Sequence, residues 1–178
     1  GMSLETFLET LTDTSADVPL SEFIEASDMM PDELDLFART WYAIDVERQR
    51  WLVTSMIELA EDNPELDFCA VFKMCLKDRD EVVLEKAMEG LWEHEDRSIV
   101  PSLIDVLHSD KSAQVRSAAA AALGKFSALV QEGKLLPKDR ESIHDCLMAV
   151  LEDLEQPVDV RRRSLEAIAP FNTGEIKK

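Results

Sequence analysis

The amino-acid sequence predicts an all-α fold in which amphipathic helices come in consecutive pairs. Apolar residues recur at intervals of three and four along most of the 178-residue chain, whereas the alternation typical of strands is scarce. Hydrophobic residues make up 46% and charged residues 31%, with only five glycines and seven prolines. This balance favours a folded helical protein over a disordered one.

The first pair of helices is expected between residues 31 and 60. Pro31 suits a first helical turn, and an apolar stripe follows it. A second helix from about Asp45 to Ala60 ends at "EDNP", a turn signal. The two stripes are Leu34, Phe37, Ala38 and Trp41, then Trp51, Leu52, Met56 and Leu59.

Three further pairs follow, each with a polar break between its two stripes. The stripes are Phe68, Val71, Phe72, Cys75 and Leu76, then Val83, Ala87 and Leu91; Val100, Leu103, Ile104 and Leu107, then Val115, Ala119, Ala122, Leu123 and Phe126; Ile143, Leu147, Val150, Leu151 and Leu154, then Val160, Ala167, Ile168 and Phe171. The second helices align from Val83, Val115 and Val160, anchors 32 (83 to 115) and 45 (115 to 160) residues apart. The extra residues, in "SALVQEGKLLPKDRE", predict a longer connection between repeats.

The segment "VPSLIDVLHSDKSAQVRSAAAAALGKF", Val100 to Phe126, resembles a HEAT repeat closely. "VDVRRRSLEAIAPF" and "DRDEVVLEKAMEGL" resemble its second helix. The resemblance covers about residues 31–171 and extends to the HEAT-like repeats of phycobilin lyases. The resemblance implies a right-handed α-α superhelix, an armadillo-like solenoid of about four helical hairpins, in which neighbours stack to share a core. Its concave face would be formed by the second helices.

The resemblance also implies structural roles for polar residues. The aspartate of the turn and the arginine of the second helix typically form a ladder between neighbouring repeats, which assigns that role to Asp110 with Arg116, and to Arg161 in the last repeat. Leu84 stands where the family prefers arginine.

Five alanines in a row, residues 118–122, lie inside the best-matching second helix. Small side chains at Ala118, Ala119 and Ala122 would let this helix approach its neighbours closely. Ala120 and Ala121 are expected to face outward or to lie at the rim of the packed face, where they serve helix propensity.

The first thirty residues carry two short apolar stripes, in "LETFLETL" and "PLSEFIEASDMM", and many acids. A solenoid needs an atypical terminal unit, so three segments are expected. Residues 1–30 are an acidic helical cap or docking segment, residues 31–171 the HEAT-like repeat domain, and residues 172–178 a flexible tail. A cytoplasmic location is expected, because the sequence shows neither a signal-peptide layout nor a membrane-spanning apolar run.

Charge points to the kind of partner. The formal net charge is −18, of which residues 1–67 hold −14 (17 acids against three arginines) and residues 68–178 hold −4 (20 acids against 16 bases). Such a field repels phosphate backbones, which disfavours nucleic acid, and attracts basic proteins. The alternative is that the charge serves solubility alone.

No catalytic or metal-binding constellation emerges, and no cofactor is expected. His94, His108 and His144 lack metal-ligand spacing, and the single "HE" pair at His94 falls short of the several that a di-iron site needs. Cys69, Cys75 and Cys146 are expected to be small buried hydrophobes.

Two tryptophans and two arginines are the candidate partner-binding residues: Trp51, Trp92, Arg162 and Arg163. Aromatic residues often anchor interfaces, although tryptophans on apolar stripes are usually core. The "RRR" run, Arg161 to Arg163, could mark a site that binds an anion. Alternatively, Arg162 and Arg163 could pair with Asp159 or Glu166 on the same helix.

The function expected from these features is a non-enzymatic scaffold or adaptor that binds another protein on its concave face. The main alternative is an enzyme or accessory protein of the HEAT-like bilin lyase type. A HEAT-like DNA glycosylase is a third hypothesis, which the net charge disfavours. The sequence leaves the oligomeric state open.

Overall fold

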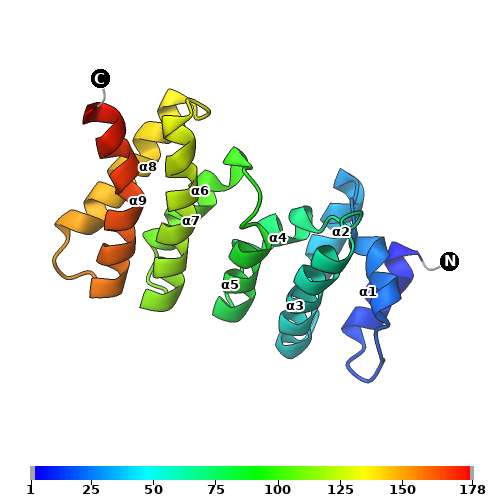
Figure 1. Ribbon diagram of the computed structural model, residues 1–178. Helices are drawn as coiled ribbons and strands as arrows, with labels where there is room; N and C mark the ends of the chain where they lie inside the picture. Colours follow the sequence, from blue (N-terminus) through cyan, green and yellow to red (C-terminus); the bar gives the residue numbers. More distant parts are fainter. Residues whose placement is uncertain (1–2, 177–178) are drawn as a thin grey trace. The chain divides into compact units, whose positions relative to one another are not determined.

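A computed structural model describes residues 3–176, with side chains up to Phe171 (Figure 1). All regular structure in the described residues is helical, which confirms the predicted fold class. The helices are α1 (Leu4–Thr12), the 3-10 helix η1 (Leu20–Ala26), α2 (Pro31–Trp41), α3 (Val46–Asp62), α4 (Cys69–Cys75), α5 (Glu81–Gly90), the 3-10 helix η2 (Arg97–Ile99), α6 (Val100–Leu107), α7 (Ala113–Gln131), α8 (Pro137–Glu152) and α9 (Val158–Ile176).

The chain divides into two compact units, and the boundary along the chain lies between Leu91 and Trp92. The first unit holds the predicted hairpins α2–α3 and α4–α5, preceded by α1 and η1, and α1 packs on both η1 and α2. The indole N–H of Trp41, which ends α2, donates to the buried carboxylate of Asp78 in the turn before α5 at 2.8 Å. This contact ties the two hairpins together.

The second unit holds the hairpins α6–α7 and α8–α9. Figure 1 shows α7 and α9 side by side, with α8 packed against α9. The long connection predicted after Phe126 is wrong in extent, because α7 continues to Gln131 and α8 begins at Pro137. Most of the inserted residues therefore lengthen two helices. Gly133, with a φ of +70°, supplies the left-handed conformation that the short link requires.

Three of the second helices, α3, α5 and α7, begin at polar caps that the sequence supplies. The side chains of Asp45, Asp80 and Ser112 accept hydrogen bonds from the amides of Glu47, Val83 and Val115 respectively, which satisfies donors that a helix leaves unpaired. The anchors Val83, Val115 and Val160 are all buried, as the repeat alignment predicts.

The alanine run packs more extensively than predicted. Ala119 is fully buried, as expected, but Ala120 is also fully buried, so the prediction that it faces outward is wrong. The reason is that α7 packs against three helices, α6, α8 and α9. At Gly124, a Cβ atom would lie 3.2 Å from the Cβ of Ala167 in α9, so small residues set this close approach.

Two further sequence predictions concern the C-terminal tail and membrane-spanning helices. The tail predicted at residues 172–178 lies beyond the described side chains, although the backbone of α9 continues to Ile176. Among the described residues, no helix is both long and apolar enough to cross a membrane.

Candidate functional site

The first unit contains an open pocket of about 460 Å³ between the α1–η1 loop and the beginning of α3. Trp51, one of the predicted partner-binding residues, forms part of its wall. The lining residues are Thr14, Ala16, Asp17, Val18, Asp45, Glu47, Arg48 and Trp51.

Arg48 holds the loop that forms one wall of the pocket. Its guanidinium group donates to the backbone carbonyl groups of Thr10, Leu11, Asp13 and Ala16, at 3.0, 3.3, 2.7 and 2.6 Å respectively. These carbonyl groups lie at the end of α1 and in the loop that follows, so one side chain of α3 holds this loop in place.

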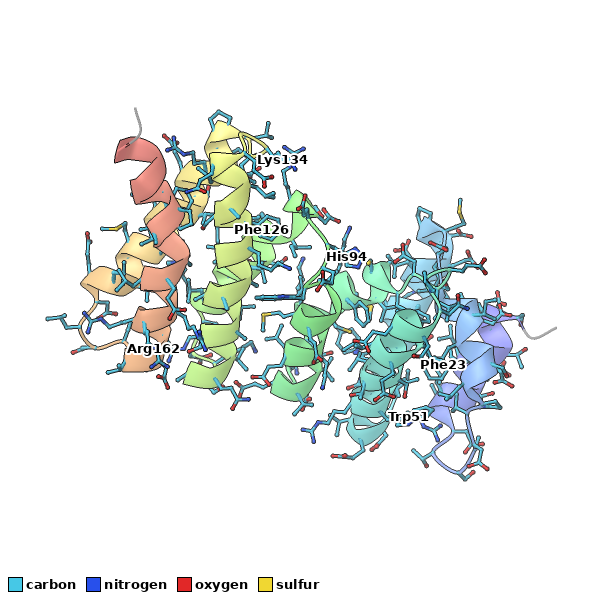
Figure 2. All side chains as sticks on the ribbon, in the orientation of Figure 1. Phe23, Trp51, His94, Phe126, Lys134 and Arg162 are labelled. Atoms are coloured by element: carbon cyan, nitrogen blue, oxygen red, sulfur yellow. The ribbon has the colours of Figure 1, made fainter. Side chains whose placement is uncertain are left out.

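Trp51 is partly packed and partly open. Its ring meets Phe23 of η1 edge-on, with centroids 5.5 Å apart and planes at 81° (Figure 2). Phe23 in turn lies 5.7 Å from Phe7 of α1. The remaining surface of Trp51, 41% of the residue, stays exposed. A fixed indole with an open surface is well suited to contact a ligand.

Carboxylates give the pocket a negative charge. Three acids, Asp17, Asp45 and Glu47, face one base, Arg48, in the lining. Asp45 caps α3, and Glu47 forms an ion pair with Arg50 at 2.9 Å. An aromatic face beside carboxylates attracts cations, because the ring quadrupole and the carboxylate charge act in the same direction.

Contacts between successive hairpins correct the predicted ladder. The Nε of Arg116 donates to the carbonyl of Lys111 at 2.9 Å, and its Nη1 donates to Gln156 of the next hairpin at 2.6 Å. Arg116 thus reaches its neighbour as predicted, but through an amide and not through Asp110, which is exposed. The Nε of Arg161 is buried without a hydrogen-bond partner among the described residues.

The family comparison agrees with this hairpin arrangement. A family model for HEAT repeats matches residues 70–169, more than half of the chain. The chain belongs to the HEAT-repeat family. Searches of curated proteins and of solved structures returned no match.

The HEAT-repeat chain also contains an ion pair between hairpins that sequence reasoning missed. Arg50 of α3 donates through Nε and Nη2 to the two carboxylate oxygens of Asp80, at 3.0 and 2.6 Å. The predicted ladder assigns no role to Arg50. The acid of the next turn, in "KDRD", is the signal that could have indicated it.

The ring of Trp92, the other candidate tryptophan, already contacts a cationic side chain of the same protein. The Nζ of Lys125 lies 4.5 Å from its ring centroid and donates to its backbone carbonyl. Trp92 remains 40% exposed. It lies in the second unit, whereas Trp51 lies in the first.

The candidate arginines Arg162 and Arg163 are both exposed on α9, and Figure 2 labels Arg162 on this helix. Arg162 pairs with Asp159 at 2.9 Å and Arg163 with Glu166 at 3.1 Å. Both pairs agree with the alternative that these arginines are solvated and paired along their own helix.

A histidine and a cysteine meet in the second unit, which the sequence did not predict. The Nε2 of His108 lies 3.2 Å from the Sγ of Cys146. Burial raises the pKa of the Cys146 thiol to about 12, so the sulfur stays protonated at neutral pH and is a poor nucleophile. Among the described residues, no group of three or more His, Cys, Asp or Glu side chains could hold a metal ion.

Proposed function

We propose that this HEAT-repeat chain is a non-enzymatic scaffold that binds a basic segment of a partner protein in the pocket beside Trp51. Helical repeats present extended surfaces that commonly bind proteins. The observation that carries the proposal is the meeting of a half-exposed indole with the carboxylates of Asp17, Asp45 and Glu47 in one open pocket.

The chemistry of the pocket selects a lysine or arginine side chain. Its carboxylates accept charge-assisted hydrogen bonds, and the face of Trp51 accepts a cation. The pairing of Lys125 with Trp92 supports this choice, since the same chain already places an ammonium group over an exposed indole.

The charge around the pocket favours a basic partner over a nucleic acid. Residues 1–67, which include every residue that lines the pocket, carry a net charge of −14. A field of that sign steers cationic segments toward the pocket and repels phosphates.

The proposal is tested by fluorescence anisotropy with labelled octa-arginine at about 0.15 M salt, where exposed charges are substantially screened. Trp51→Ala is expected to weaken binding about fivefold, because a cation–π contact contributes about 1 kcal/mol. The control is Tyr42→Ala, which removes an exposed aromatic residue outside the pocket lining.

Asp17→Asn is expected to weaken binding as well, because it removes a pocket carboxylate without loss of volume. Equal affinity of the wild-type and Trp51→Ala chains would contradict the proposal, since binding would then reflect the diffuse negative charge of the whole surface.

A further inference from the structure

Two second helices of the chain carry the same side-chain pattern at the same spacing. In α3 the pattern is Val46, Arg50 and Val53; in α9 it is Val158, Arg162 and Leu165. Residues spaced by four and then three lie on one helix face. In both helices the arginine also pairs with an acid three residues earlier, Glu47 or Asp159, at 2.9 Å.

In α3, the next second helix covers the Arg50–Val53 part of this face, whereas Val46 stays 40% exposed. Helix α5 packs against α3, and Val53 is fully buried. Asp80, which precedes α5, binds the Arg50 guanidinium with both carboxylate oxygens and also caps α5 through the Val83 amide at 3.0 Å. The arginine of one helix thus recognises the acidic N-cap of the helix laid beside it.

In α9, the same face is open. Leu165 is 59% exposed and Val158 is 74% exposed. The opposite side of α9 is already occupied, since Ala167 is buried at the close approach to Gly124 of α7. Ala120, which corresponds to Leu165 in the repeat, is fully buried in α7 because α9 lies beside that helix (Figure 1).

The exposed surface of α9 is therefore partly apolar, unlike the polar outer face of a capping repeat. It combines branched apolar side chains with Arg162. The equivalent residue in α3, Arg50, binds the acidic N-cap of α5. Helix α5 and its cap Asp80 show which kind of helix packs on this pattern in α3, and they therefore indicate the chemistry of a helix that would bind α9.

We propose that the Val158–Arg162–Leu165 face of α9 docks an amphipathic helix of a partner protein whose N-cap is an aspartate or glutamate. The helix lies along α9 as α5 lies along α3, with its acidic cap on Arg162 and its apolar side chains over Leu165. This surface belongs to the second unit and is separate from the Trp51 pocket.

The test uses the full chain with a tethered probe. The segment "DRDEVVLEKAMEGL", residues 78–91, contains the acidic cap and helix α5, and it is appended after Lys178 through a flexible Gly/Ser linker of about 20 residues. Tethering supplies an effective concentration on the order of millimolar, so even weak docking is detected. The control carries a scrambled version of the same segment.

Amide hydrogen exchange across α9 is the readout. The matched tail is expected to slow exchange at least about fivefold relative to the scrambled tail, because docking protects the helix. Arg162→Glu should abolish the protection, and a lysine in place of the tail's copy of Asp80 should restore it in that variant. Circular dichroism checks that the Arg162→Glu chain folds.

Equal exchange with matched and scrambled tails would overturn the proposal, as would protection that survives Arg162→Glu. Sedimentation of the chain without a tail tests the other occupant. A dimer that Leu165→Glu dissociates would show that a second copy takes the face, and would also overturn the proposal.

Discussion

The guanidinium group of Arg50 holds both carboxylate oxygens of Asp80, at 3.0 and 2.6 Å, across the junction of two successive hairpins. The same carboxylate caps α5 through the amide of Val83. One acidic side chain therefore both begins a helix and joins it to its neighbour, and its removal should affect folding more than the loss of an ordinary cap.

Asp80→Ala is expected to lower the free energy of unfolding by about 1–2 kcal/mol, because the helix loses its cap as well as its ion pair. Asp45→Ala is the comparison, since Asp45 caps α3 through the Glu47 amide. Chemical denaturation of both variants measures the difference. A smaller loss for Asp80→Ala than for Asp45→Ala would show that the contact with Arg50 adds no stability.

The same ion pair predicts a pH dependence. The hydrogen bond from Arg50 holds the pKa of Asp80 below its ordinary value, helped by the Val83 and Val82 amides and opposed by burial. The ionised form therefore stabilises the fold above the unfolded pKa of about 4, and this contribution is lost as the pH falls through the lower folded pKa. Urea unfolding should show a stability difference between wild type and Asp80→Asn that shrinks from pH 6 to pH 3. A difference that stays constant over this range would contradict the assignment.

Arg48 predicts how the N-terminal segment is held. Its guanidinium group binds carbonyl groups at the end of α1 and in the following loop, so Arg48→Ala should release this loop. Limited proteolysis is expected to cut the variant between residues 12 and 19 faster than the wild type. Arg39→Ala, which removes an exposed arginine of α2, is the control. Equal cleavage rates for the three proteins would show that other contacts hold the loop.

The sequence predicted the paired helices and their register well, because buried anchors such as Val83, Val115 and Val160 recur in equivalent positions. It failed at Ala120, since periodicity within one helix does not reveal how many neighbours that helix has. It also failed at Asp110, because family position alone does not say whether Arg116 meets an aspartate or the amide of Gln156.

The candidate site was predicted only in part. Trp51 was identified by its residue type, but the pocket beside it depends on the α1–η1 loop, which Arg48 places from more than thirty residues away in sequence. Such a contact leaves no periodic signal. The meeting of His108 with Cys146 escaped prediction for the same reason.

Substitution of Gly90 is expected to disrupt the packing against Phe72. A Cβ atom there would lie 2.6 Å from the ring of Phe72, which is buried. Gly90→Ala should therefore destabilise the fold by about 1–3 kcal/mol, although alanine is the better helix former. Thermal unfolding measures the effect. Adding Phe72→Leu should reduce the penalty of the glycine change, and a stabilised Gly90→Ala chain would contradict the close approach.

The central claim is that the Trp51 pocket binds a protein partner, and affinity capture tests it most directly. Wild-type, Trp51→Ala and Tyr42→Ala chains are immobilised at equal density, and proteins retained from a lysate are quantified. We expect basic proteins that bind saturably to the wild type and to Tyr42→Ala and are lost from Trp51→Ala. Retention of the same proteins by all three chains, or by none, would contradict the claim.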